Sequence, residues 1–263
     1  MPIEAGAVRL SPLDTERFGI RTARVDDVDE RGLSEVVEFC HTNAIDLLIA
    51  RCAVNKLAAL AALNEAAFSL MDTLVYFERD LAGFAPPQSS DPAIEELLPE
   101  DAPQIEEIAR TCFRDYPGHY HADPRLDRNA CAEVYADWAR NCCGLAETAG
   151  FTLVTGAPGR RLGFATFEKR TPGSAELTLG AVLPAGRGNG FYRRLTVAGM
   201  TRLKAEGVLT LRASTHIANW SAQVSWLGAG LRPYDAYYTF HRWFSDSATR
   251  ADPGQLQRGL ASD

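Results

Sequence analysis

The sequence has little that would tie it to a membrane or to nucleic acid. It contains no apolar run of membrane-spanning length, and Met1–Ala5 does not begin a signal-peptide pattern. It also contains no long basic run, and 27 basic against 34 acidic residues give a net charge of −7. Nucleic acid binds mainly through basic side chains, so it is not expected as a partner. We expect a cytoplasmic protein with no membrane partner.

Cysteine is sparse and is not spaced for disulfide or metal chemistry. The six cysteines include no C-x-x-C pair, and most lie in apolar, helix-like patterns that are typical of reduced core thiols. The adjacent Cys142 and Cys143 are interpreted as packing at a helix end, not as an acyl carrier. His119 and His121, with Asp123 nearby, lack a further ligand at suitable spacing, so no metal site is expected.

The chain is long and apolar enough for two domains. It has 263 residues, of which 46% are hydrophobic. The stretch Gly83–Pro92 carries three prolines, one glycine and two serines, a composition typical of a linker. We predict a small α/β domain over residues 1–82, a linker over 83–92, a second domain over 93–244, and a flexible polar tail over 245–263.

Hydrophobic periodicity predicts alternating strands and helices in both domains. In the first domain, strands are expected at 8–10, 20–25, 45–50 and 68–79, and helices at 32–43 and 55–67. In the second, strands are expected at 93–98, 151–155, 161–168, 176–182, 208–213 and 237–244. Its helices are expected to begin at Asp101, Asp127, Tyr192 and Asn219. The order β-α-α-β-β-β-α-β-α-β predicts an α/β fold.

A glycine-rich turn joins the strand that ends at Val182 to the helix that begins at Tyr192. Such a turn presents unpaired backbone N–H groups and the positive end of a helix dipole, which attract a phosphate or pyrophosphate. The turn lacks the G-x-G-x-x-G spacing of dinucleotide folds and the Gly-Lys-Ser/Thr of nucleoside triphosphatases. Pro184 removes a backbone donor, which suits a splayed strand end. A strand-to-helix corner without a ligand is the alternative.

Two stretches resemble signatures of the GNAT superfamily of N-acetyltransferases. Val182–Gly190 resembles the V-x-P-x-x-R-G-x-G loop, although Tyr192 stands where the pattern has a small residue. Asn219–Leu231 resembles the N-x-x-A-x-x-x-Y-x-x-x-G-F helix, with Trp226 in place of the tyrosine. The resemblance implies acetyl-CoA as co-substrate and a GNAT fold. That fold has a central mixed, mostly antiparallel sheet with a splayed strand pair, flanked by helices and here preceded by a small α/β domain.

Within that superfamily the chain most resembles the TDP-fucosamine acetyltransferases, which N-acetylate a 4-amino-4,6-dideoxyhexose on a nucleotide. The similar stretches include Phe18-Gly19, Phe68–Asp72, Val134–Trp138 and Leu211–Thr215. This resemblance implies a dTDP-linked amino sugar as the acceptor and an N-terminal domain that helps to form the acceptor pocket. Another amine, such as an antibiotic, an amino acid or a peptide N-terminus, is an alternative, as is a GNAT domain that binds without catalysis. A homodimer is left open.

The resemblance also implies which residues bind the two substrates. Backbone groups near Ala181–Leu183 would bind the pantetheine arm and the oxyanion, and residues 187–192 would bind the pyrophosphate. Arg187 is alternatively a solvated surface charge. The residues expected to contact acetyl-CoA are Ala181, Val182, Leu183, Arg187, Gly188, Asn189, Gly190, Phe191, Tyr192, Asn219 and Trp226. Those expected to contact the acceptor are Phe18, Tyr116, His119, Tyr120 and His121.

Direct transfer requires a base, because the attacking amine must be unprotonated. Asp72 is the first candidate, through a water if necessary, and its alternative role is a charge on the solvent face of a strand. His216 is the second candidate, because it follows a strand near the expected acetyl group. Its alternative is a loop histidine bonded to backbone. Glu176 is a third candidate, although a glutamate early in a strand is more often a surface residue.

The departing CoA thiolate has no obvious acid. In the resembling family a tyrosine at the position of Trp226 is thought to protonate the thiolate, but indole N–H is not a practical acid. We expect the thiolate to leave without a dedicated acid, since the pKa of a thiol is only about 8.5. Trp226 would then pack against the pantetheine arm. The alternative is another phenol, from Tyr192, Tyr234, Tyr237 or Tyr238.

Overall fold

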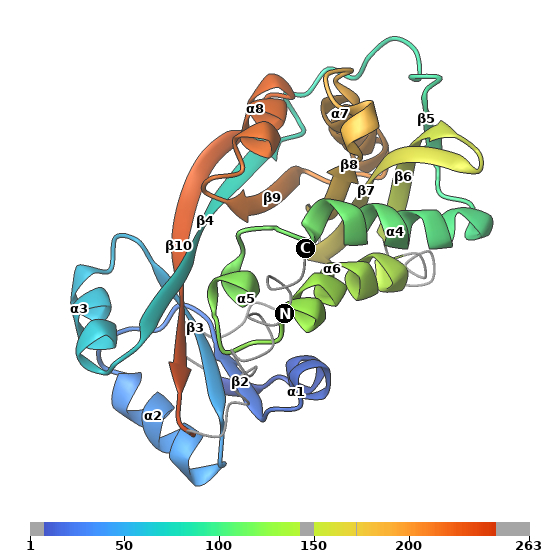
Figure 1. Ribbon diagram of the computed structural model, residues 1–263. Coiled ribbons are helices and arrows are strands. Elements are labelled where there is room, and N and C mark those ends of the chain that lie inside the picture. The colour runs from blue at the N-terminus through green and yellow to red at the C-terminus, as the bar shows by residue number, and fades with distance from the viewer. Residues whose placement is uncertain (1–7, 143–149, 172, 246–263) are drawn as a thin grey trace, which may run out of the picture. The chain divides into compact units, whose positions relative to one another are not determined.

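The computed structural model describes residues 8–142, 150–171 and 173–245, and the chain divides into two compact units (Figure 1). Among the described residues, the larger unit comprises 72–117 and 132–237, and the smaller comprises 8–71, 118–131 and 238–245. The units alternate along the chain, whereas the sequence suggested consecutive domains separated by a linker. Cys143 and the predicted tail beyond residue 245 lie outside the described residues.

Three elements contribute residues to both units. They are strand β4 (Ser69–Asp80), helix α6 (Arg128–Cys142) and strand β10 (Arg232–Trp243). β4 and α6 match strand and helix predictions closely, because both show strong local periodicity. β10 begins five residues before the predicted strand, because its first half contains a proline and an aspartate that disguise the pattern.

The smaller unit alternates strands and helices as expected. Its remaining elements are β1 (Val8–Leu10), α1 (Pro12–Phe18), β2 (Thr22–Val25), α2 (Leu33–Thr42), β3 (Leu47–Ala53), α3 (Leu57–Glu65) and α5 (His119–Ala122). β1 pairs antiparallel with β2, and β2 pairs parallel with β3. Periodicity predicts Leu33, Val36, Val37 and Cys40 on the inner face of α2, and all are buried except Val37, which is half-buried. They share one core with β2 and β3.

The larger unit is built on a mixed sheet. Its remaining elements are β5 (Ile94–Glu96), η1 (Pro99–Asp101), α4 (Ala102–Phe113), β6 (Gly150–Ala157), β7 (Arg160–Thr171), β8 (Ser174–Val182), η3 (Pro184–Gly186), α7 (Phe191–Ala205), β9 (Thr210–His216) and α8 (Trp220–Gly228). The strand order is β10-β4-β9-β8-β7-β6-β5. β8 and β9 run parallel, and the pairs β4–β9, β5–β6, β6–β7 and β7–β8 are antiparallel. This confirms the predicted α/β class.

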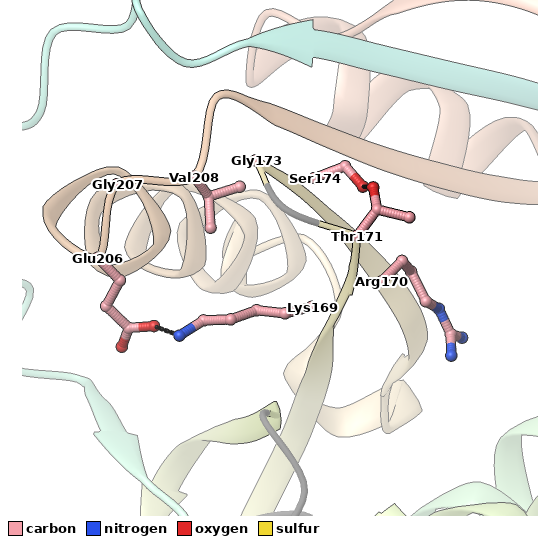
Figure 2. A pocket seen from close by; sticks show the side chains of 8 residues that line it. All are labelled: Lys169, Arg170, Thr171, Gly173, Ser174, Glu206, Gly207 and Val208. Atoms are coloured by element: carbon pink, nitrogen blue, oxygen red, sulfur yellow. Dashed lines mark hydrogen bonds and ion pairs between the residues drawn. The ribbon is translucent and has the colours of Figure 1, made fainter. Parts of the chain in front are cut away.

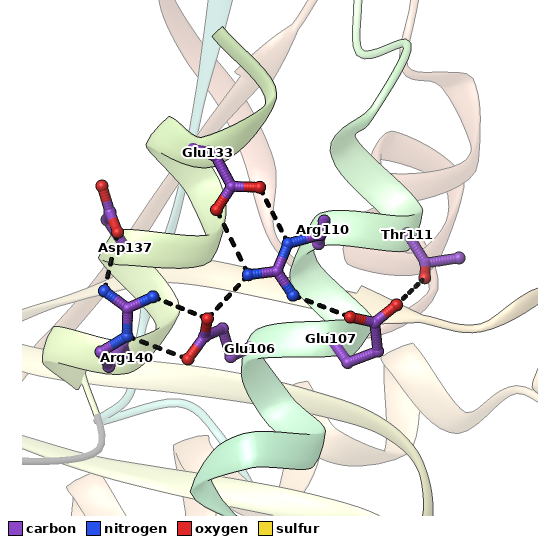
Figure 3. Close-up of polar contacts among 7 residues, drawn as sticks. All are labelled: Glu106, Glu107, Arg110, Thr111, Glu133, Asp137 and Arg140. Carbon is purple, nitrogen blue, oxygen red and sulfur yellow. Dashed lines mark hydrogen bonds and ion pairs between the residues drawn. The ribbon is translucent and has the colours of Figure 1, made fainter. Parts of the chain in front are cut away.

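Helices cover both faces of this sheet (Figure 1). α7 packs on the face that carries Phe151 and Phe167, whose rings stack 5.0 Å apart. α4 lies with α6 on the other face, where charged side chains join them (Figure 3). In that network Arg110 binds Glu106, Glu107 and Glu133, while Arg140 also binds Glu106. Hydrogen bonds, first from Arg140 and then from Arg110, hold the pKa of Glu106 at about 2.

Some local predictions were wrong. α1 was missed, although Ser11 followed by Pro12 is a common start of a helix. The periodicity of the helix that begins at Asp127 predicts an inward Trp138, but this side chain is 38% exposed. The spacing of Asp101 and Gln104 resembles a capping box, but the two residues do not form one. Asp101 binds the buried Arg161 guanidinium at 2.8 Å and 2.9 Å, and Gln104 accepts the Arg161 backbone N–H. An unpaired charge on a buried arginine costs more free energy than an uncapped helix end. No helix within the described residues could cross a membrane.

Candidate active site

Strands β8 and β9 separate part of the way along their length. Their parallel pairing runs from Ser174 opposite Thr210 to Leu177 opposite Ala213, and no further pair is found among the described residues. Both strands nevertheless continue, β8 to Val182 and β9 to His216. We call the gap between residues 178–182 and 214–216 the split. It leaves backbone groups on one edge of β8 without a strand partner.

The backbone N–H of Val182 points into the split. On its other edge β8 stays paired with β7 through Val182 opposite Gly163, and the next residue, Leu183, donates its N–H to the Leu162 carbonyl at 2.8 Å. Successive residues of a strand direct their backbone groups to opposite edges, so those of Val182 point away from β7. The Val182 carbonyl accordingly accepts from the Cys112 thiol of α4 at 3.6 Å.

The glycine-rich turn after β8 is open to solvent. Residues 187–190 are exposed, and Gly188 and Gly190 have positive φ angles of 81° and 69°. A Cβ at either glycine would meet no atom within 4 Å. The glycines are therefore required by backbone conformation, and the space beside them is free. Gly190 is the N-cap of α7 with no side-chain cap, so N–H groups at the start of this helix lack an internal partner.

The charges around this turn favour an anion. Arg187 and Arg193 are exposed, and neither forms an ion pair within the described part of the chain. Arg194, by contrast, is neutralised by Asp91, with two contacts of 2.5 Å. Asn189 donates its side-chain amide to the carbonyls of Gly186 and Arg187, so its side chain holds the turn. Together with the helix dipole, the two arginines give a positive site.

A polar cluster lies on the β9 side of the split. The Tyr116 phenol accepts the backbone N–H of His216 at 3.0 Å and lies 3.2 Å from the Thr215 hydroxyl. Asn219 donates to the Thr215 hydroxyl at 2.9 Å and also caps α8 by accepting the Ala222 N–H. Asn219 therefore has a structural role. Sequence reasoning missed Thr215, although it belonged to a stretch that carried the family resemblance.

The two candidate bases differ in their surroundings. Asp72 is only 5% exposed, and its charge helps to raise the pKa of Tyr116, which burial raises first. A proton would reach Asp72 through an intervening group. His216 is partly exposed, but its Nδ1 accepts the Ala218 N–H at 3.0 Å. The neutral ring therefore carries its proton on Nε2, which cannot accept another. Glu176, early in β8, instead pairs with Arg170.

Trp226 does not line the split, contrary to the sequence-based expectation. It is 1% exposed and packs between Phe77 and Tyr192, with ring centroids 5.5 Å and 6.2 Å away. A side chain buried in the core cannot contact a pantetheine arm. Tyr192 is partly exposed and lies against Gly180 of β8, where a Cβ would come within 2.8 Å of its ring. The ring of Tyr192 thus covers Trp226.

The other expected acceptor contacts belong to a network within the smaller unit. Phe18 packs on Tyr120, with centroids 5.4 Å apart, and the Tyr120 phenol donates to Asp14 at 2.7 Å. His119 and Tyr120 are each 7% exposed, and His121 is half-buried. The Nδ1 of His119 lies 2.9 Å from the Nε2 of His241. Of the five residues, only Tyr116 lies in the larger unit.

A separate pocket of about 340 Å³ lies at the opposite end of β8 (Figure 2). Its walls include the ion pair of Lys169 with Glu206 and the hydroxyls of Thr171 and Ser174, which lie 2.6 Å apart. A strand rises about 3.3 Å per residue. Ser174 therefore lies roughly 26 Å along β8 from Val182, too far for this pocket to share the chemistry of the split. No cluster of potential metal ligands is found in the described ranges.

Comparison with known proteins identifies the fold. No protein-family model and no curated protein sequence matches the chain significantly. Among solved structures, a GCN5-related N-acetyltransferase from Sphaerobacter thermophilus is 14% identical, with a TM-score of 0.62 over 90% of this chain and 76% of its own. A tandem GNAT protein from the clavulanic acid biosynthesis pathway is 14% identical, with a TM-score of 0.58 over 87% and 77%.

A more distant match is a Saccharomyces cerevisiae N-myristoyltransferase solved with bound myristoyl-CoA. It is 12% identical, with a TM-score of 0.54 over 84% of this chain and 59% of its own. At such identities the comparisons establish a shared fold, that of the GNAT acyltransferases, which the sequence predicted. They give no support to the finer resemblance to the TDP-fucosamine acetyltransferases, which remains a hypothesis from sequence.

Proposed function

We propose that this chain is an N-acetyltransferase that uses acetyl-CoA. The observation that carries the proposal is the direct succession of the split edge of β8 and the open glycine turn at the start of α7. A split strand offers backbone donors to an extended amide chain, and the turn offers N–H groups to a pyrophosphate. Pantetheine and pyrophosphate follow each other in the same order in CoA. The unpaired edge of β8, which includes Val182, would hold the first and the turn of residues 187–192 the second, whereas Ala181 and Leu183 direct their backbone groups to β7.

The chemistry is a direct attack of an amine on the thioester carbonyl. The Val182 N–H, which points into the split, would stabilise the oxyanion that forms. One such donor is typically worth about 3 kcal/mol. Asp72 would take the amine proton, and the bond from the carbonyl carbon to sulfur would break. Trp226 and the Asn219 side chain are not included among the acetyl-CoA contacts, because one is buried and the other caps a helix.

We further propose that the acceptor is the amine of a dTDP-linked amino-deoxy sugar. This step rests on the sequence resemblance spread over residues 10–244 and on the α/β unit that accompanies the GNAT fold. Another small-molecule amine, such as an antibiotic, an amino acid or a peptide N-terminus, is the alternative acceptor. A degenerate domain is disfavoured, because the exposed turn at Arg187–Gly190 keeps every feature needed to bind an anion.

A panel of amines tests both parts of the proposal. The purified chain is mixed with acetyl-CoA and, in turn, a dTDP-4-amino-4,6-dideoxy sugar, an aminoglycoside, an amino acid and a short peptide, and thiol release is followed. We expect turnover with the nucleotide sugar. Turnover with another amine alone would refute the acceptor assignment and leave acetyl transfer standing. Failure of calorimetry to detect acetyl-CoA binding would refute the whole proposal.

A further inference from the structure

A phenol lies on the β8 side of the split. Tyr192, in the first turn of α7, places its ring against Gly180, which belongs to the part of β8 that has lost its pairing with β9. The ring fits only because residue 180 has no side chain. An acyl thioester that follows this strand edge would pass the phenol. Trp226 and Tyr116 lie near this phenol.

The surroundings of Tyr192 keep its proton in place. Burial raises the pKa of this phenol well above its usual value, and the neighbouring Tyr116 raises it further, against an opposing effect of Trp226. Indole N–H is a donor only, so a hydrogen bond from Trp226 would go to the phenol oxygen and would not use the phenol hydrogen. The Tyr192 hydroxyl is therefore left as a neutral hydrogen-bond donor.

Such a phenol is suited to bind a thiolate without protonating it. A thiol has a pKa of about 8.5, below that of even an ordinary phenol, so full transfer of the phenolic proton to sulfur is uphill. A hydrogen bond to the anion has no such penalty, and bonds to charged groups are the stronger ones. The raised pKa of Tyr192 makes it a poor acid and leaves it a competent donor.

We propose that Tyr192 is a further catalytic residue, which donates a hydrogen bond to the sulfur as the thiolate departs. This inference rests on the proposed acetyl transfer. In that reaction the bond from amine nitrogen to carbonyl carbon forms, and the carbon–sulfur bond breaks with its electron pair going to sulfur. The amine proton goes to Asp72. Tyr192 keeps its own proton throughout, and CoA is released as the thiolate to be protonated by solvent.

The other tyrosines considered from the sequence do not compete for this role. Tyr234 and Tyr237 pack around Tyr76, with ring centroids 6.3 Å and 5.3 Å from it. Tyr76 lies opposite Ser214, whereas Tyr116 contacts the adjacent Thr215, so the two groups lie on opposite sides of β9. Tyr238 belongs to the smaller unit. This leaves Tyr234→Phe as a matched control that removes a phenol elsewhere.

The test measures the pKa of the CoA thiol while CoA is bound. Thiolate ultraviolet absorbance is followed against pH for CoA bound to the wild type, Tyr192→Phe and Tyr234→Phe proteins. The same proteins with desulfo-CoA supply the background of ionised tyrosines. We expect Tyr192→Phe to raise the thiol pKa by about one unit, because it removes a bond to the charged form, and Tyr234→Phe to leave it unchanged. Circular dichroism checks that both variants fold.

Steady-state kinetics separate a hydrogen-bond donor from an acid. We expect kcat of Tyr192→Phe to fall roughly tenfold, with nearly unchanged acetyl-CoA affinity and an unaltered shape of the pH profile. An unchanged thiol pKa with CoA still bound would refute the inference and leave the proposed function intact. A thousandfold loss with a changed basic limb would show proton transfer in place of a hydrogen bond. Absence of CoA binding to the wild type would overturn both proposals.

Discussion

Gly199 of α7 and Phe167 of β7 meet with no room for a side chain between them, because a Cβ at residue 199 would overlap the phenyl ring. Phe167 is fully buried, so its ring cannot swing into solvent. This contact fixes the distance of α7 from the sheet. It therefore also fixes where the start of α7, and with it the glycine turn, lies relative to the end of β8.

We predict that Gly199→Ala destabilises the protein by about 1–3 kcal/mol, because overpacking outweighs the gain of roughly 1 kcal/mol in helix propensity. Urea unfolding followed by circular dichroism measures the change. Gly228→Ala in α8 is the control, since its Cβ would meet only the flexible side chain of Arg193, at 3.2 Å. Equal midpoints for the two variants would contradict the prediction.

Gly190→Asp should weaken acetyl-CoA binding at least tenfold, which corresponds to about 1.4 kcal/mol. It places a negative charge and a strained positive φ at the proposed pyrophosphate site. Gly159→Asp is a matched control, because Gly159 also has a positive φ, of 74°, and no atom within 4 Å of its Cβ position. Isothermal titration calorimetry compares the two. Similar losses in both variants would remove the turn from the binding site.

Asp72→Asn should lower kcat by roughly 10²- to 10⁴-fold, the range for loss of a general base, while acetyl-CoA affinity changes little. The substitution keeps the size of this buried side chain, so the fold should persist. His216→Gln is the comparison and should have the smaller effect, because Nδ1 of His216 is already occupied by the Ala218 N–H. Turnover rates of both variants between pH 6 and pH 9 measure the two effects. A larger loss in His216→Gln than in Asp72→Asn would make His216 the base.

Trp226→Ala should cost about 3–5 kcal/mol of stability, the usual range for removing a buried tryptophan. Trp226→Phe should keep most of the stability and of kcat. The sequence-based expectation that Trp226 packs against the pantetheine arm would instead predict weaker CoA binding in the alanine variant, but the indole is 1% exposed. Thermal unfolding and calorimetry with acetyl-CoA separate the two effects. Full stability of the alanine variant with weakened binding would restore the earlier expectation.

The smaller unit should lose stability in mild acid. Burial, with the nearby charge of His241, lowers the pKa of His119 well below 6.5, so the unfolded chain binds a proton more readily than the folded one. Stability is therefore complete above a pH of about 6.5 and falls by up to about 1.4 kcal/mol per pH unit below it. Hydrogen exchange of β2 and β3 between pH 5 and pH 8 measures the loss. His119→Gln should flatten this dependence, and an unchanged slope in that variant would contradict the assignment.

The sequence predicted β8, the glycine turn and α7 well because their signals are local. Alternating burial, Pro184 and the positive-φ glycines all act within a few residues. The split itself could not be derived in this way. It depends on where the pairing of β8 with β9 stops, and the two partners lie more than thirty residues apart. Pro184 suited a splayed strand end and the family resemblance implied one, but neither showed where the pairing stops.

The positions of Tyr192 and Trp226 show a similar limit. The sequence shows that both residues depart from the GNAT pattern, but it does not show that the two departures are connected. In the structure the two rings are neighbours, with Tyr192 partly exposed and Trp226 buried beneath it. Helices α7 and α8 bring them together across a span of 34 residues. Residue spacing along one helix could not show this, because the contact is tertiary.

The passage of β4 through both units has a consequence for the dissection of this protein. A fragment that begins after the proline-rich segment would contain the glycine turn, yet it would lack β4, whose residues 74–80 pair with β9. The edge of β9 would then be bare, and exposed strand edges promote aggregation. Cutting at the apparent linker would yield an insoluble piece, whereas circular permutation that keeps β4 joined to the larger unit would preserve the sheet.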